Sequence, residues 1–323
     1  MKTIGFVISG KPNEKRRAIL PENVKMVSNS NMILIERGYG KVLGIDDSQY
    51  SQLGACVVST EDVYEADIIC NPKTPTAEET SRFHQGQTLF GWIHAVQGRR
   101  IVDFLVEREM TAVAWEDMYY ADSRHVFWRN NEIAGEAAVI HALPFLSVVP
   151  NELLVAVIGR GNTARGATRI LDRLGAKVDV YDRKRAHSLR DKLHLYDLVV
   201  NAVMWDVFDD KRLIYRDDLA HMKRGSMIVD ISCDEGLEIE TSKPTTIDNP
   251  VYEVDGILHY AVDHTPTIFH ESATKSIAAA LTPFLDDLIC ERENRILQTA
   301  TAILGGKIVD ERILRYQSRC SVG

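Results

Sequence analysis

The stretch from Val155 to Gly166, VAVIGRGNTARG, constrains the fold of this chain more than any other. Its first four residues are apolar and mostly β-branched, which predicts a buried parallel strand. A turn of the pattern G-x-G-x-x-A follows, and a helix is expected to begin within it. Glycine permits a tight turn close to a pyrophosphate, and the N–H groups at the helix start attract its charge. The pattern predicts a dinucleotide site whose phosphates contact Gly159, Gly161, Asn162, Thr163 and Ala164.

The residues after this turn extend the dinucleotide pattern. A helix is expected to close at Gly175, and a second strand, residues 177–181, ends before Asp182, which lies 21 residues after Gly161. A carboxylate at this position can reach an adenosine ribose and disfavours a 2′-phosphate, which favours NAD. Arg183, Lys184 and Arg185 follow at once, and such cations hold the phosphate of NADP. We expect NADP, with NAD as the less favoured alternative. The remaining alternative is an ordinary βα turn that binds no dinucleotide.

Length and composition exclude several classes of protein. At 323 residues the chain is long enough for about two domains, and its net charge of -8 argues against a nucleic acid partner. The five cysteines are scattered without ligand spacing, so we expect neither a disulfide framework nor a metal site. No stretch resembles a signal peptide or approaches 18 apolar residues, so we expect no membrane contact and a cytoplasmic location.

Strand and helix patterns alternate along the chain, which predicts an α/β fold with mainly parallel sheets. A long apolar helix pattern at residues 132–146 and another at residues 271–290 bracket the glycine-rich half. We therefore expect two Rossmann-like domains with a cleft between them. A discontinuous substrate domain would comprise residues 1–130 and 285–323, and residues 131–284 would form an inserted NAD(P)-binding domain.

Three residues of the first domain follow predicted strands and could carry chemistry. Arg16, beside Arg17, could bind a carboxylate, although a solvated basic turn is the alternative. Lys73 lies between two prolines at a strand end, where an ordinary exposed lysine is the alternative. His94 suits proton transfer at neutral pH, although it could equally be a packed core histidine. The carboxyl ends of parallel strands meet at one edge, so these groups are expected to converge.

In the second half, acidic residues follow two further predicted strands. Asp234 follows the strand SMIVDIS, and Asp263 and His264 follow HYAV. Both loops would lie near the nicotinamide end of a cofactor. Their acidic side chains could receive an amine or orient a base, although aspartate is also a common turn residue.

Seven segments, in order along nearly the whole chain, resemble the alanine dehydrogenase and lysine-forming saccharopine dehydrogenase family: EKRRAILP, ADIICNPKTP, QTLFGWIHAV, RNNEIAGEAA, VAVIGRGNTARGA, IVDISCDEG and HYAVDHTPT. The resemblance implies that Arg16 binds the substrate carboxylate and that Lys73 and His94 are the catalytic proton carriers. It also places Asp234 and Asp263 among the substrate-binding residues, and Asp263 and His264 beside the cofactor.

The resemblance also implies a reaction. The D-H-x-P loop replaces the A-N-x-P of alanine dehydrogenases, which favours an amine-bearing second substrate over ammonia. Within the family, the chain resembles a smaller type of member that reductively joins pyruvate to the side-chain amine of ornithine or lysine through an imine, using NADPH. Glu116, Asp234 and Asp263 could hold substrate amino groups, and a homo-oligomer is expected. Alternatives are a saccharopine-type or alanine-type dehydrogenase, or a dinucleotide-binding protein without catalysis.

Overall fold

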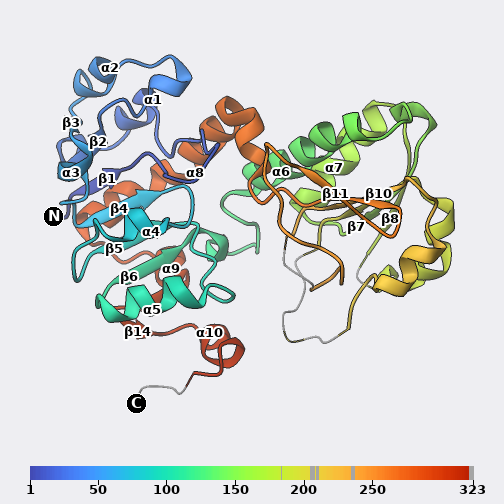
Figure 1. Cartoon of the computed structure of the whole chain (residues 1–323). Coiled ribbons are helices and arrows are strands. Elements are labelled where there is room, and N and C mark those ends of the chain that lie inside the picture. Colours follow the sequence, from blue (N-terminus) through green and yellow to red (C-terminus); the bar gives the residue numbers. More distant parts are fainter. Residues whose placement is uncertain (183, 204–207, 209–210, 234–236, 320–323) are drawn as a thin grey trace. The chain divides into compact units, whose positions relative to one another are not determined.

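The computed structural model describes residues 1–182, 184–203, 208, 211–233 and 237–319. The chain divides into two compact units (Figure 1). Unit 1 comprises Met1–Trp128 and His270–Gly323, and unit 2 comprises Arg129–Phe269. The chain thus leaves unit 1 once, forms unit 2 and returns.

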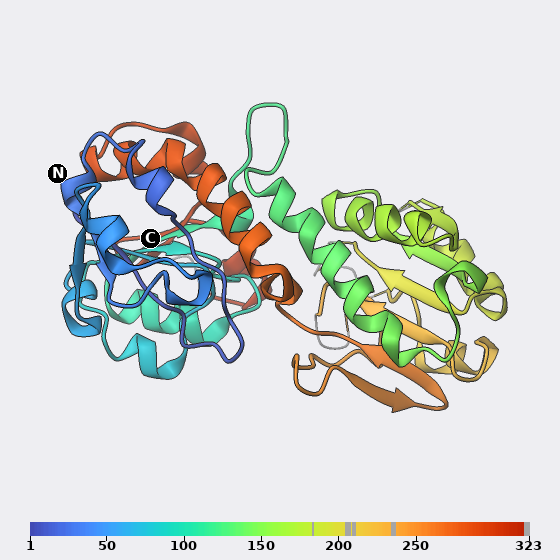
Figure 2. The same ribbon diagram turned by 90° about the horizontal axis from the view of Figure 1, so that it is seen from above.

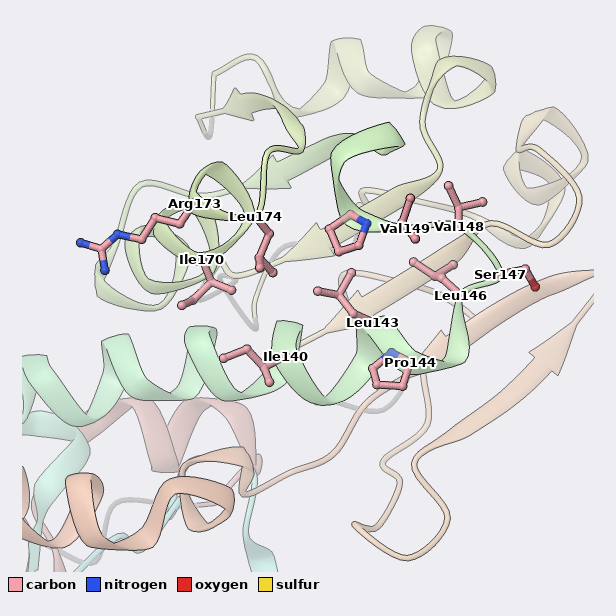
Figure 3. A pocket seen from close by; sticks show the side chains of 11 residues that line it. Ile140, Leu143, Pro144, Leu146, Ser147, Val148, Val149, Ile170, Arg173 and Leu174 are labelled. Atoms are coloured by element: carbon pink, nitrogen blue, oxygen red, sulfur yellow. The ribbon is translucent and has the colours of Figure 1, made fainter.

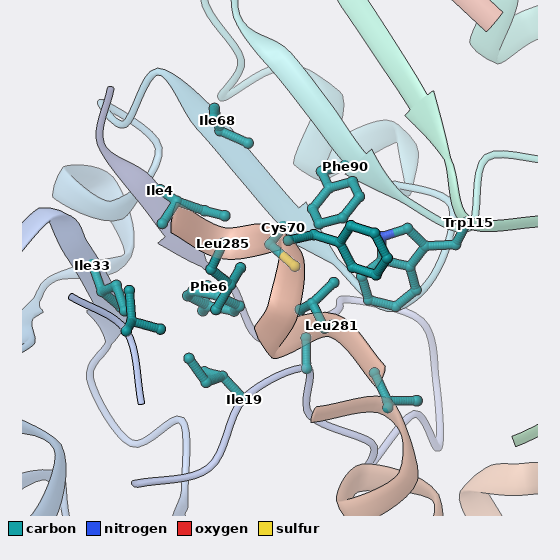
Figure 4. Packing of buried hydrophobic residues seen from close by; sticks show 14 of the residues in the cluster. Ile4, Phe6, Ile19, Ile33, Ile68, Cys70, Phe90, Trp115, Leu281 and Leu285 are labelled. Carbon is teal, nitrogen blue, oxygen red and sulfur yellow. The ribbon is translucent and has the colours of Figure 1, made fainter. Parts of the chain in front are cut away.

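The return to unit 1 lies earlier in the sequence than the predicted boundary at 284/285. The structure places it at 269/270, before helix α8 (His270–Cys290). The reason is packing, because one face of α8 is buried in the core of unit 1 through Ile277, Leu281, Phe284 and Leu285. Figure 4 shows Leu281 and Leu285 beside Phe6 and Cys70 of the sheet. A helix that fills the core of unit 1 belongs to that unit.

Unit 1 is built on a sheet of eight strands in the order β14-β13-β6-β5-β4-β1-β2-β3. The six strands from β6 to β3 are parallel, and β13 and β14 add an antiparallel edge. The strands are β1 (Ile4–Phe6), β2 (Ile33–Glu36), β3 (Cys56–Val58), β4 (Ile68–Asn71), β5 (Thr88–Gly91), β6 (Thr111–Ala114), β13 (Thr301–Leu304) and β14 (Lys307–Ile308).

Both faces of this sheet are buried. In β4, Ile68 and Cys70 face one core cluster and Ile69 faces another, as expected because successive strand residues point to opposite faces. Helix α8 covers the first face, and α5 (Arg99–Glu107) covers the second. The remaining helices and 3-10 turns of unit 1 are α1 (Pro21–Val24), η1 (Ser30–Met32), η2 (Lys41–Leu43), α2 (Asp47–Ser51), α3 (Thr60–Val63), α4 (Ala77–Thr80), η3 (Trp115–Asp117), α9 (Arg295–Thr299) and α10 (Glu311–Tyr316).

Unit 2 is built on a sheet of six strands in the order β11-β12-β10-β9-β7-β8, parallel except for β11. The predicted α/β fold with two mainly parallel sheets is therefore confirmed. The strands are β7 (Leu154–Ile158), β8 (Lys177–Tyr181), β9 (Leu198–Asn201), β10 (Met227–Asp230), β11 (Val251–Val254) and β12 (Ile257–Tyr260). The helices and turns are α6 (Trp128–Ala142), η4 (Leu143–Phe145), η5 (Pro150–Glu152), α7 (Asn162–Arg173), η6 (Ala186–Leu195), η7 (Arg216–His221) and η8 (Thr265–Phe269).

Two glycines let α6, the long green helix in Figure 2, cross α7 at close range. A Cβ on Gly166 of α7 would lie 2.0 Å from the carbonyl oxygen of Glu132, and one on Gly135 would lie 1.9 Å from that of Thr163. Gly166 therefore faces α6. Among the described residues, no helix combines the length and apolar character that crossing a membrane requires.

Replacing Gly166 with alanine is expected to lower the free energy of unfolding. Alanine gains about 1 kcal/mol of helix propensity over glycine, but its Cβ would overlap a backbone carbonyl, and overpacking typically costs about 1–3 kcal/mol. The urea midpoint should fall. Gly161→Ala is the control, because a Cβ there meets no atom within 4 Å, and its stability without dinucleotide should equal that of the wild type. Equal midpoints for all three proteins would contradict the close helix crossing.

Candidate active site

Four loops with chemically active residues follow neighbouring parallel strands of unit 1. Arg16 lies in the loop after β1, Lys73 follows β4, His94 follows β5 and Glu116 follows β6. The strand order β6-β5-β4-β1 makes these four strands consecutive in the sheet. Their carboxyl ends share one edge, which is where ligands of parallel sheets bind.

Glu116 holds the backbone of His94. Its Oε1 accepts the N–H of His94 at 2.5 Å, and its Oε2 accepts the N–H of Ile93 at 3.2 Å. His94 has a φ of 52°, in the left-handed region that residues other than glycine rarely adopt, and such strain persists only where neighbouring groups enforce it. The His94 side chain is exposed, so the alternative of a packed core histidine is wrong.

The Glu116 carboxyl titrates near neutral pH. Burial raises the pKa of Glu116 from 4.5 to about 7, and the negative charge of Asp117 adds to this rise. The two N–H groups that it accepts stabilise the charged form and lower the pKa, but they do not outweigh burial. Protonation of Glu116 would therefore weaken its hold on His94 within the physiological range.

A second histidine, His125, lies at this edge, and its ring and that of His94 both stack near the Trp92 ring. The Trp92 ring is nearly parallel to the rings of His94 and His125, with centroids 6.4 Å and 6.0 Å away. Nδ1 of His125 accepts the N–H of Phe127 at 3.0 Å, so its proton resides on Nε2, 3.2 Å from the Glu116 carbonyl. Burial lowers the pKa of His125 to about 4, which keeps it neutral. No motif in the sequence marks this residue.

The Lys73 loop is tied to the loop after β1. Asn71 Oδ1 accepts the Lys73 N–H at 3.1 Å, and Asn71 Nδ2 donates to Glu79 Oε1 at 2.9 Å. The same Glu79 oxygen accepts the N–H of Gly10 at 3.0 Å. Lys73 is half-buried, so it is not the ordinary exposed lysine that was the alternative.

Arg16 is a buried, oriented guanidinium, so the alternative of a solvated basic turn is wrong. It is 4% exposed, and its Nε and Nη2 donate to the two carboxylate oxygens of Glu14 at 2.8 Å and 2.6 Å. This pairing uses one edge of the guanidinium, and the other edge can serve a second carboxylate. Arg17 is structural instead, since its Nε donates to the Tyr39 carbonyl at 2.5 Å and its guanidinium lies 5.3 Å from that ring's centroid.

In unit 2, the turn after β7 fits a pyrophosphate. Gly159 has a φ of 119°, and a Cβ there would lie 2.7 Å from the Ala202 carbonyl, so this position requires glycine. Gly161 precedes α7, and the space where its Cβ would lie is open within 4 Å. Ala164 is buried beneath the turn. Since β8 and β9 flank β7 on opposite sides, the turn lies at a switch point of the sheet, where dinucleotides bind.

Two arginines flank Asp182 at the end of β8. Arg160 Nη2 lies 3.6 Å from Asp182 Oδ2, and the N–H of Arg185 donates to Oδ1 at 3.0 Å. The Arg185 guanidinium lies over the Tyr181 ring, 5.5 Å from its centroid. Arg160 was missed in the sequence because it occupies the variable position of G-x-G, which carries no signal of its own.

The remaining predicted site residues are also in unit 2. Lys184 is exposed, and Arg183 and Asp234 lie outside the residues that the structure describes. Asp263 and His264 follow β12, and Asp263 Oδ1 lies 2.5 Å from His264 Nδ1. His264 is buried and Asp263 is half-buried, so the carboxylate is the more accessible of the two.

Unit 2 also has an apolar groove of about 630 Å³ beside the ends of α6 and α7 (Figure 3). Ile140, Leu143, Ile170 and Leu174 line it, and Arg173 is the one charged residue in its lining. It offers no acid or base and is not a catalytic candidate. In the described part of the chain, no group of three or more His, Cys, Asp or Glu side chains could hold a metal ion.

Comparisons with known proteins point to one family. The family model for the alanine dehydrogenase/PNT N-terminal domain matches residues 10–134, and that for the C-terminal domain matches residues 183–316. The N(5)-(carboxyethyl)ornithine synthase of Clostridium botulinum (strain Hall) is 29% identical over 320 residues, which cover 91% of this chain and 99% of the relative. The enzyme of the same name from Lactococcus lactis subsp. lactis is 27% identical, with 90% and 96% covered.

A solved structure of an L-alanine dehydrogenase shares the fold. It superposes with a TM-score of 0.83 over 98% of this chain and 99% of its own, at 22% identity. Both units of the present chain therefore have counterparts in that structure.

The Glu116→Gln variant should change how stability depends on pH. A carboxyl whose pKa is higher in the folded state binds its proton more tightly there, so Glu116 makes the wild type lose stability between pH 4.5 and about 7. The variant lacks this titration. As pH rises across that range, the unfolding free energy of the variant minus that of the wild type should therefore increase by up to about 1.4 kcal/mol per pH unit. Urea unfolding of both proteins at several pH values measures this, and a constant difference would refute it.

Proposed function

The chain belongs to the alanine dehydrogenase/PNT family, and from that membership we propose that it joins pyruvate to the side-chain amine of ornithine or lysine. It is an oxidoreductase of a family that binds a nicotinamide dinucleotide. The product of the proposed reaction with ornithine is N(5)-(carboxyethyl)ornithine. Two relatives that bear that enzyme's name match this chain over nearly their full lengths, which supports the choice.

One observation carries the proposal: a buried cation and two proton carriers follow adjacent strands of unit 1. Arg16, Lys73 and His94 lie in the loops after β1, β4 and β5, which are consecutive in the sheet. A protein that only binds a dinucleotide has no need of proton carriers beside a carboxylate-binding group. The arrangement supports catalysis on a keto acid.

In the proposed reaction, Arg16 binds the carboxylate of pyruvate with the guanidinium edge that Glu14 leaves open. The keto oxygen lies within reach of Lys73 and His94. Holding the keto acid in one orientation converts the encounter with the amine into a reaction between positioned groups, which can supply several kcal/mol of the barrier.

The neutral side-chain amine then attacks the keto carbon and forms a carbinolamine. Lys73 or His94 donates a proton to the departing hydroxyl, water leaves and an imine forms, steps in which general acid catalysis contributes about 10²- to 10⁴-fold. Glu116 acts as a positioning residue, because its two oxygens already accept the backbone N–H groups of Ile93 and His94. This leaves Asp234 and Asp263 as the residues proposed to hold the substrate amino group.

The dinucleotide would lie on unit 2, with its diphosphate at Gly159, Gly161, Asn162, Thr163 and Ala164. The required glycine at 159 and the open space at 161 support this fit. The group supplies a hydride to the imine carbon when bound. Asp263 and His264 are proposed to orient its nicotinamide end.

We favour NADPH over NADH. Asp182 alone would repel a 2′-phosphate, but the Arg160 guanidinium lies 3.6 Å from its carboxylate, and Arg185, whose backbone N–H donates to Asp182, holds its own guanidinium over the neighbouring Tyr181 ring. These two guanidinium groups, with Arg183 and Lys184 of the basic run, offset the charge of Asp182 and provide donors for a phosphate. Cytoplasmic location and homo-oligomeric assembly are part of the proposal.

The absorbance of NADPH tests the function directly. It should fall when pyruvate is present with ornithine or lysine, and the Lys73→Ala and His94→Ala variants should be slower by about 10²- to 10⁴-fold with dinucleotide binding intact. Consumption with pyruvate and ammonia would indicate an alanine-type enzyme instead, and consumption with 2-oxoglutarate and lysine a saccharopine-type enzyme. Binding of NADPH without turnover of any pair would favour a non-catalytic protein, and a full rate in either variant would remove that residue from the mechanism.

Replacing Arg160 with glutamine should change cofactor preference. The variant loses the cation that lies 3.6 Å from Asp182, so the KM for NADPH should rise by at least about 10-fold, as expected for a charge-assisted phosphate contact of about 1.5–3 kcal/mol. The KM for NADH should change little, because a ribose hydroxyl bonds to Asp182 without a cation. Arg173→Gln, on the outer end of α7, is the control. Equal changes for both cofactors would argue that Arg160 does not contact the 2′-phosphate.

A further inference from the structure

The C-terminal part of unit 1 contacts the loop that carries His94. The Gln317 amide, on a residue only 4% exposed, donates from Nε2 to the carbonyl oxygens of Ala95 at 2.8 Å and Val96 at 3.0 Å. The backbone oxygen of Gln317 accepts a bond from Arg99 Nη2 at 2.5 Å. These contacts fall on the residues that come directly after His94.

The orientation of the Gln317 amide is fixed by its other end. Arg319 Nε donates to Gln317 Oε1 at 2.6 Å, so the amide N–H groups must point to the two carbonyl oxygens. Arg319 Nη2 also donates to Asp103 Oδ1 of α5 at 2.5 Å. The side-chain amide therefore has one arrangement that satisfies both of its ends.

The same segment reaches the loop that carries Glu116. Arg312 Nη2 lies 2.7 Å from Asp117 Oδ2 and 2.6 Å from Asp310 Oδ2. Asp117 is the neighbour of Glu116 in η3. Residues 312–319 thus contact both the loop that carries His94 and the loop that carries Glu116. The hydrogen bond from the His94 N–H to Glu116 joins these same two loops.

We propose that Arg312, Gln317 and Arg319, which we call the C-terminal clasp, position His94 for proton transfer. The inference rests on the proposed function, since it assigns His94 a proton to carry. The backbone of His94 has a φ of 52°, which relaxes unless neighbours enforce it. Glu116 accepts the hydrogen bond of the His94 N–H, and Gln317 of the clasp donates to the carbonyl oxygens of the next two residues, Ala95 and Val96.

The loop between these two anchors is short and closed on itself. The Gly98 N–H donates to the His94 carbonyl at 2.9 Å, so the carbonyls that Gln317 binds lie inside a single tight turn. Movement of Ala95 and Val96 would therefore pass directly to His94. The clasp residues touch no reacting atom in this scheme, which makes them positioning residues rather than catalytic ones.

The test replaces Gln317 with alanine and, separately, with glutamate, which keeps the shape of the side chain but removes both donors. Each variant should lower kcat by about 10- to 100-fold, the effect expected when a catalytic group moves by about 1 Å. The KM for NADPH should stay within about 2-fold, because unit 2 is proposed to bind the dinucleotide and unit 2 is unchanged. Gln298→Ala, an exposed glutamine of α9, is the matched control and should retain the wild-type kcat.

Hydrogen exchange in the absence of substrates gives a readout that does not depend on the reaction. The amides of His94 and Gly98 should exchange faster in both Gln317 variants, whereas those of β5 should exchange as in the wild type. Unchanged exchange, or a kcat no lower than that of Gln298→Ala, would overturn the clasp. If the alanine variant does not fold, the glutamate variant decides. If the wild type turns over no substrate pair, the proposed function fails while the exchange experiment still tests the clasp.

Discussion

The candidate site depends on the parallel pairing of β1, β4, β5 and β6. Parallel strands end at the same edge, so strand pairing by itself brings the loops after them together, and contacts such as that between Glu116 and the His94 N–H then fix them. Four residues of different chemistry reach that edge, each on the loop after its own strand: a guanidinium, an amine, an imidazole and a carboxyl. The cores on both faces of the sheet hold the strands in register, so the edge is as rigid as the sheet.

Removal from water then determines the orientation of Arg16 and the pKa of Glu116. Glu14 orients Arg16 by occupying one edge of its guanidinium, and a buried cation left without that partner would destabilise the fold. Glu116 is a half-buried carboxyl, and its removal from water, together with the charge of Asp117, raises its pKa to about 7. Its role in fixing the His94 backbone therefore varies with pH in the range where an imidazole also titrates.

The sequence predicted the fold class, the glycine turn and the loops that carry Arg16, Lys73 and His94, because strand patterns and G-x-G-x-x-A are local signals. The sequence-based boundary at 284/285 falls within α8, because the residue pattern of a long apolar helix is the same whether the helix packs in the core of unit 1 or of unit 2. Glu116 was considered only as a partner for substrate, because its bonds to Ile93 and His94 join residues more than twenty positions apart. His125, Arg160 and Gln317 carried no motif, and only the tertiary structure gives them neighbours.

Arg16 and His94 are proposed to act on one bound keto acid. Histidines labelled with ¹³C at Cε1 allow a direct measurement, with the His94 resonance assigned from the His94→Gln variant. Pyruvate added in the presence of oxidised dinucleotide should shift that resonance with saturable dependence on concentration, and Arg16→Gln should weaken or abolish the shift. A His94 resonance that does not respond to pyruvate in the wild type, or that responds equally in Arg16→Gln, would show that these two residues do not share one keto acid site.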